Sequence, residues 1–210
     1  GTYNALIYFG DCYLELISIE HEQIYEQAAK VPFTLHETYA KLGRRNGICR
    51  SALRVQGIEA VAEVFKGTEF EFDEPTHFTR QTKLGTTVGW QLFHVGKRES
   101  EGDVPFFIDW EFADEERFST LSEQQVIAPH LAGDLRVAEV HMAVQNCADL
   151  KRFYKLIRLP ITEIDNGFEV LLNNTRWIYL QCTEQASLCT LLKFTGAFAV
   201  SYTHLRAHET

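Results

Sequence analysis

Two stretches of the chain, ALRVQGIEAVAEVFK at residues 52–66 and HMAVQNCADLKRFYK at residues 141–155, align without a gap. In each stretch a short strand-like segment leads into a segment whose apolar residues recur at helical spacing. Val55 and Gln56 meet Val144 and Gln145, hydrophobic classes match along the helix stripe, and the alignment ends on Lys66 and Lys155. The same element order met twice predicts an internal structural repeat.

Strand-like pairs repeat as well. NALIYFG from Asn4 lies over WQLFHVG from Trp90, and YLEL from Tyr13 lies over FIDW from Phe107 and YLQC from Tyr179. The repeating unit is therefore strand–helix–strand–strand–strand, and we expect it three times. The first copy is expected to lack its opening strand and helix. These units predict an α+β fold class.

The repeat predicts the domain organisation. We expect a first domain over 1–115 with two copies, a linker with some helix over 116–134, and a further partial copy over 135–198. The final residues, 199–210, fit no upstream pattern and resemble translated adapter sequence, so we predict a non-native tail.

Composition narrows the class of protein. The net charge is -9 and the pI is about 5.4, so the surface repels phosphate backbones and no nucleic-acid partner is expected. We find no apolar run near the roughly 20 residues of a membrane-spanning helix, so no membrane partner is expected. The cysteines number five and show no CxxC spacing, which indicates free thiols in a reducing, cytoplasmic setting.

The opening stretch, GTYNALIYFGDCYLELI at residues 1–17, closely resembles the glyoxalase-like domain of the vicinal oxygen chelate superfamily. In that domain a Gly-Thr-x-Asn-x-Leu hairpin runs into a Tyr-Leu-Glu strand. LRVQGIEAVAEVF (53–65) and VPFFIDWE (104–111) are similar to its second half. The resemblance covers 1–112 well and 135–195 more loosely. It implies that repeated βαβββ modules pair, so that their curved mixed sheets enclose a cavity.

In metal-using members, the resemblance implies a divalent metal ion held by the first and last strands of each module, where it polarises vicinal oxygens of a substrate. Glu15 lies in such a last strand and shares its face with Tyr13 and Ile17. A carboxylate there is costly to bury unless it is paired, hydrogen-bonded or metal-bound. Glu15 is therefore the candidate metal ligand or general base. The alternatives are an ion pair with Arg50 or Arg54, and exposure at a sheet edge.

Other positions weaken the metal hypothesis. Asp109 stands in the matching strand of the second copy, either as a pocket residue or, with Glu111, as part of a solvated acidic edge. The position on the first strand where the family places a metal ligand is Ala52 in the second copy, and an alanine side chain cannot bind a metal. In the third copy it is His141, which we expect to pair with Glu139 at a surface or interface. The chain as given does not complete a metal site.

The expected ligand pocket comprises six side chains: Asn4, Tyr8, Tyr13, Glu15, Trp90 and Asp109. The aromatic members alternatively fill a core. Because no GxSxG, P-loop or GxGxxG motif occurs, the function follows from the resemblance. The first hypothesis is a bacterial-type, metal-dependent isomerase, lyase or dioxygenase acting on a small oxygenated metabolite. The alternative is a non-catalytic protein that binds or sequesters a small molecule. A third hypothesis is a scaffold that forms a homodimer by completing its sheet with another chain.

Overall fold

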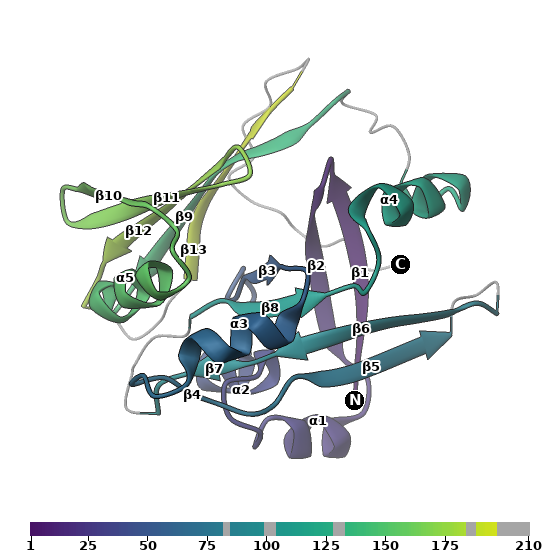
Figure 1. Cartoon of the computed structure of the whole chain (residues 1–210), viewed down its shortest axis with the longest axis horizontal. Helices are drawn as coiled ribbons and strands as arrows, with labels where there is room; N and C mark the ends of the chain where they lie inside the picture. Colours follow the sequence, from purple (N-terminus) through teal and green to yellow (C-terminus); the bar gives the residue numbers. More distant parts are fainter. Residues whose placement is uncertain (82–84, 99–103, 128–132, 184–187, 197–210) are drawn as a thin grey trace.

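The computed structural model describes residues 1–81, 85–98, 104–127, 133–183 and 188–196, which form an α+β fold (Figure 1). Its helices are α1 (Glu22–Ala28), α2 (Leu35–Lys41), α3 (Ile58–Phe65), α4 (Asp114–Glu123) and α5 (Cys147–Leu156). Its strands are β1 (Thr2–Phe9), β2 (Cys12–Ile19), β3 (Ala52–Arg54), β4 (Glu71–Phe72), β5 (Thr76–Gln81), β6 (Thr87–Phe93), β7 (Val95–Gly96), β8 (Phe106–Asp109), β9 (Arg136–Val144), β10 (Ile161–Ile164), β11 (Gly167–Leu172), β12 (Thr175–Gln181) and β13 (Leu188–Thr195). Among these described residues, no helix is long and apolar enough to cross a membrane.

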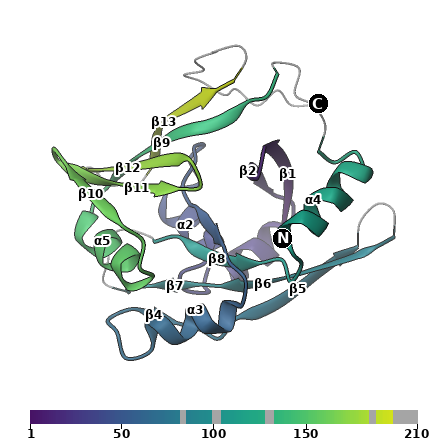
Figure 2. The same cartoon turned by 45° about the horizontal axis from the view of Figure 1, so that its top comes forward.

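The strands form two larger sheets and two small ones. The larger sheets have the orders β3-β8-β6-β5 and β10-β11-β12-β9-β13, and β1-β2 and β4-β7 form two-stranded sheets. Figure 2 shows that the β1-β2 hairpin and α4 lie on the same side of the molecule. The chain thus brings its first strands next to a helix that follows more than ninety residues later in sequence, counting from Ile19 to Asp114.

Both larger sheets contain the same connection. A strand leads into a helix, and the chain returns through antiparallel strands until the last of them lies parallel to the first, as β8 does to β3 and β12 does to β9. A parallel neighbour requires a crossover connection, which α3 and α5 supply. β13 then pairs antiparallel with the other edge of β9.

The helix α3 follows directly from its sequence. Ile58, Ala62 and Phe65 are buried and stand four and three residues apart, which places them on one stripe of the helix. The helix begins after Gly57, whose φ is 77°, and the chain leaves it through Gly67, whose φ is 72°. Glycine adopts this left-handed conformation without steric cost. The helix predicted over these residues is confirmed.

The helix α5 is the counterpart of α3 in the second large sheet. Asn146 precedes it, and its side chain accepts a hydrogen bond from the backbone N–H of Asp149 at 3.1 Å. This is an N-cap interaction, which satisfies one of the N–H groups that a helix start leaves open. The buried face of the helix carries Leu150, Phe153 and Tyr154. The strand and helix predicted from residues 141–155 are therefore also confirmed.

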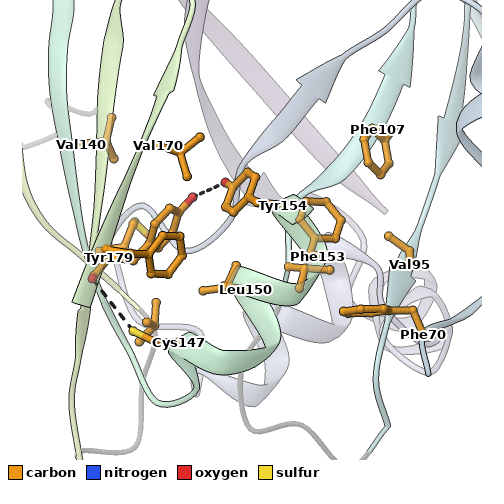
Figure 3. Close-up of a cluster of buried hydrophobic side chains, with 14 of the residues drawn as sticks. Phe70, Val95, Phe107, Val140, Cys147, Leu150, Phe153, Tyr154, Val170 and Tyr179 are labelled. Atoms are coloured by element: carbon orange, nitrogen blue, oxygen red, sulfur yellow. Dashed lines mark hydrogen bonds between the residues drawn. The ribbon is translucent and has the colours of Figure 1, made fainter. Parts of the chain in front are cut away.

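One aromatic core joins the two large sheets, as Figure 3 shows. The ring of Phe153 lies 5.7 Å from that of Phe65 on α3 and 5.6 Å from that of Phe107 on β8. On the other side of Phe153, Tyr154 reaches Tyr179 on β12 through a hydrogen bond of 2.5 Å between their hydroxyl groups. Burial raises the pKa of both phenols, so they stay neutral. α5 is therefore the element that joins the sheets.

Some elements differ from the sequence prediction. The sequence prediction did not include β5 or β13. All six residues of β5 are exposed, so its sequence lacks the apolar alternation by which strands are recognised. The charged segment after β2, in contrast, predicts a helical connection broken before Pro32, and it forms α1 and α2 on either side of that proline. The predicted tail over 199–210 lies outside the described residues.

Candidate functional site

Four of the predicted pocket residues share one face of the β1-β2 hairpin. The antiparallel register sets Tyr8 opposite Tyr13, and side chains two residues apart on a strand share a face, so Asn4 and Glu15 lie on this face too. The side-chain amide of Asn4 donates a 2.7 Å hydrogen bond to the carboxylate of Glu15. The rings of Tyr8 and Tyr13 lie 5.4 Å apart. We call these four residues the hairpin site.

The hairpin site sets the carboxylate of Glu15 beside the phenol of Tyr13. Burial, reinforced by the negative charge of Glu15, raises the pKa of Tyr13 to about 12, while the nearby cation Arg117 opposes this shift. Tyr13 is therefore a hydrogen-bonding phenol at neutral pH. Glu15 itself is exposed. The site thus offers an amide, a carboxylate and phenol hydroxyls to a small polar molecule.

A line of aromatic side chains leads away from the hairpin site. Arg117 on α4 donates to the hydroxyl of Tyr8 at 3.3 Å, and its guanidinium lies 4.1 Å from the ring centre of Trp110. The ring of Trp110 is 5.8 Å from that of Trp90, which in turn is 6.0 Å from that of Phe78. We call Phe78, Trp90, Trp110 and Arg117 the aromatic row. Trp90, predicted for the pocket, is thus linked to Tyr8 through Trp110 and Arg117.

Asp109 lies elsewhere, because its carboxylate is buried against the start of α3. One carboxylate oxygen accepts the backbone N–H of Gly57 at 2.7 Å and that of Ile58 at 3.3 Å. The other accepts the N–H of Glu111 at 2.8 Å. Such contacts satisfy the open N–H groups of a helix start and complement its partial positive charge. Asp109 therefore stabilises the fold from the side of the sheet that faces α3.

In the five-stranded sheet, β12 matches β8 in the repeat and makes the same kind of contact with a helix start. The side-chain oxygen of Gln181 on β12 accepts the backbone N–H of Cys147, the first residue of α5, at 3.1 Å. In the sequence alignment of the copies, Gln181 and Asp109 both match Glu15. Both aligned side chains therefore contact a helix start, which is a structural role that sequence reasoning did not consider.

Glu15 has the contacts of a polar surface carboxylate. Its carboxylate accepts a hydrogen bond from Asn4, whereas Arg54, one of its predicted ion-pair partners, pairs with Asp114 at 2.8 Å. Arg50, the other, donates to the hydroxyl of Thr38 at 2.7 Å. Exposure at the hairpin is therefore the alternative that agrees with the structure.

The family resemblance implies a divalent metal ion, and this can be tested on the side chains present. Within the part of the chain that the structure describes, His, Cys, Asp and Glu side chains form no group of three or more that could hold a metal ion. Glu15 has an amide beside it and Asp109 is engaged at α3. The described residues therefore do not fit a divalent ion held by protein ligands alone.

His141 lies on the five-stranded sheet in an ionic cluster centred on Glu139. The expected pair forms, with 2.8 Å between the imidazole Nε2 and the carboxylate, and its side chains are only 19% and 17% exposed. Glu139 also binds Lys193 at 2.6 Å and Arg176 at 3.0 Å. These hydrogen bonds, first that from Lys193 and then that from His141, lower the pKa of Glu139 to about 2.

This lowered pKa predicts a pH-dependent stability. Because the folded pKa of Glu139 lies below its usual value, its contribution is complete above about pH 4.5 and is lost as the pH falls through about 2. We expect Glu139→Gln to lower the free energy of unfolding at pH 7 by about 1 to 2 kcal/mol, since water screens the half-exposed cations. Urea unfolding at pH 7, 4 and 3 measures the free energy of unfolding of the wild type and of the variant. The difference from wild type should shrink toward low pH, while Glu26→Gln, an exposed control, should show none. A difference that stays constant with pH would argue against the cluster.

Sequence reasoning missed three members of the aromatic row. Trp110 follows β8 directly, and strand alternation could have placed it on the face opposite Asp109. Phe78 lies in the polar strand that was not predicted, and Arg117 lies in the segment interpreted as a linker. Only the meeting of these segments in space shows that they form one surface.

Comparison with known proteins gives similarities of two kinds, to a family model and to solved structures. Residues 1–157 match the family model described as the glyoxalase-like domain. The fold is similar to the crystal structure of a hypothetical protein from Staphylococcus aureus, with a TM-score of 0.81 and 22% sequence identity over 96% of this chain and 80% of that one. No curated protein matches the chain. At this identity, the structural match supports the fold alone.

Proposed function

The chain belongs to the glyoxalase-like domain family of the vicinal oxygen chelate superfamily, and from this premise we propose that it binds a small oxygen-bearing metabolite at the hairpin site. The observation that carries the proposal is the Asn4–Glu15 hydrogen bond beside the facing phenols of Tyr8 and Tyr13. Together these groups provide donors and acceptors within reach of one small molecule.

The balance of charge around the hairpin site supports binding of a polar molecule. The carboxylate of Glu15 accepts hydrogen bonds from ligand hydroxyls, while Arg117, on the far side of Tyr8, attracts a carboxylate or carbonyl oxygen. Tyr13 remains protonated, so it is able to donate as well as accept. We propose that the two large sheets are paired βαβββ modules and that they carry this site as a rigid support.

The metal-dependent enzyme of the family is the competing function, and Glu15 is where the two functions differ. In the enzyme, its carboxylate would bind the ion; in a binding protein, it would accept from the ligand directly. Glu15→Gln keeps the shape of the side chain and removes the charge, so it tests both. Measurement of bound divalent ions in the purified wild type and in this variant tells the two apart.

We expect small keto and hydroxy acids to raise the thermal stability of the protein. The probes are glyoxylate, pyruvate, lactate and 2-oxoglutarate, each followed by differential scanning fluorimetry. A probe at one hundred times its Kd stabilises by about 2.7 kcal/mol, which for a chain of this size is a shift of roughly 5 to 10 °C. Tyr13→Phe and Glu15→Gln should each remove most of the shift, because they remove a hydroxyl and a charge from the hairpin site.

Tyr3→Phe provides the matched control. Tyr3 is on the opposite face of β1 and is 59% exposed, so its variant should respond to the probes as the wild type does. The proposal fails if no probe shifts the unfolding temperature, or if the shift survives both hairpin-site variants. A stoichiometric divalent ion that is lost in Glu15→Gln would replace binding by the metal-dependent function.

A further inference from the structure

The aromatic row spans neighbouring strands on one face of the four-stranded sheet. Phe78 on β5 stands directly opposite Trp90 on β6, and their rings are nearly parallel, with an interplanar angle of 16°. Trp110, at the end of β8, continues the row. Phe78 is 39% exposed and both tryptophans are half-buried. The sheet therefore presents a partly accessible, connected aromatic surface, which is suited to a flat ring.

A cation stands at the end of this surface. The guanidinium of Arg117 lies over Trp110 and donates to the phenol of Tyr8. Within the described part of the chain, Arg117 has no carboxylate partner. The chain carries a net charge of -9, so a half-buried arginine without such a partner is notable. Guanidinium groups bind carboxylates through paired hydrogen bonds, and this one retains donors for an anion.

The remaining polar groups of the aromatic row are also donors. Among the described residues, neither the indole N–H of Trp90 nor that of Trp110 donates a hydrogen bond. An indole nitrogen donates only, as does a guanidinium. A neutral sugar also stacks on indole rings, but its hydroxyls need acceptors, which these side chains lack. The donors and the cation together select a ligand with acceptor atoms and a negative charge.

We propose that the aromatic row binds a planar aromatic carboxylate, with its ring on Trp90 and its carboxylate on Arg117. This inference rests on the proposed function and refines it, because Arg117 also contacts Tyr8 of the hairpin site. The ring of the ligand lies on the sheet, and its acid group lies between the sheet and the hairpin. The ligand class is thereby narrowed from small oxygen-bearing molecules to aromatic acids.

Isothermal titration of the full chain with 2-naphthoate tests this inference. Two further probes isolate its parts: 2-naphthamide keeps the ring and removes the charge, and cyclohexanecarboxylate keeps the charge and removes the aromatic ring. We expect both to bind at least about ten-fold more weakly than 2-naphthoate. Trp90→Leu and Arg117→Gln should each weaken 2-naphthoate at least about ten-fold, and Trp90→Phe, which keeps a ring, should weaken it less.

Matched controls lie outside the aromatic row. Phe112→Leu removes a ring that is 49% exposed, and Arg98→Gln removes an exposed arginine that pairs with Glu71. Both should bind 2-naphthoate as the wild type does. Circular dichroism confirms that each variant is folded. The inference is overturned if 2-naphthoate does not bind, if the amide binds equally well, or if folded Trp90→Leu and Arg117→Gln keep wild-type affinity.

The result is separable from that of the hairpin site. If keto and hydroxy acids stabilise the protein through Glu15 but 2-naphthoate does not bind, the proposed function stands and the aromatic ligand is wrong. If 2-naphthoate binds through Trp90 while Glu15→Gln and Tyr13→Phe change nothing with any probe, the aromatic row is a binding site and the hairpin site is not.

Discussion

Replacing Phe153 with alanine is expected to lower the free energy of unfolding by about 3 to 5 kcal/mol, the range for a large aromatic residue removed from a packed core. Phe153 is fully buried, and its ring lies near those of Phe65, Phe70, Phe107 and Tyr154. Phe65 lies on α3, Phe107 lies on β8 of the four-stranded sheet, and Tyr154 lies on α5 beside Phe153 itself. The cavity would therefore open where α5 packs against α3 and the four-stranded sheet.

Thermal and urea unfolding measure this effect, and the unfolding temperature should fall by roughly 10 °C. Phe153→Leu, which retains most of the volume, should cost much less. Leu171→Ala is the control, because Leu171 is 60% exposed and its loss should change stability by no more than about 0.5 kcal/mol. Equal effects of Phe153→Ala and Leu171→Ala would show that the sheets do not share this core.

Replacing Asp109 with alanine is expected to cost about 2 to 4 kcal/mol, because the N–H groups of Gly57, Ile58 and Glu111 all lose one buried carboxylate acceptor. Asp109 is only 7% exposed, so water does not readily take its place. Asp109→Asn keeps one carbonyl acceptor toward α3 and should cost about 1 kcal/mol. Urea unfolding of the three proteins at pH 7 checks this order.

Asp114→Ala is the control for Asp109→Ala, because it also removes one negative charge but leaves the N–H groups at the start of α3 with their acceptor. Asp114 begins α4, is half-exposed and pairs with Arg54 at the surface, so its removal should cost less than about 1 kcal/mol. If Asp109→Ala proves no more destabilising than Asp114→Ala, its carboxylate does not support α3. A ligand-binding defect in a stable Asp109→Ala protein would instead favour the pocket role predicted from the sequence.

Much of the fold was predictable because its signals are local. The apolar stripe of α3, the turn at Gly10 between β1 and β2 and the strand over 136–144 each depend on residues near one another in the chain. The hairpin site was predictable for the same reason, since register and strand alternation place Tyr8 beside Tyr13. β5 escaped prediction because an exposed strand has no apolar face to reveal it.

The sequence by itself determined the two strand-and-helix repeats that contain α3 and α5, the β1-β2 hairpin and the glyoxalase-like family, because each depends on patterns within short stretches. Only the tertiary structure decided that Asp109 contacts α3, that Arg117 joins Trp110 to Tyr8, and that Lys193 reaches Glu139. A strand pattern indicates which residues share a face but not what packs against that face. What a side chain contacts across the molecule is settled when distant segments bury their apolar surfaces together.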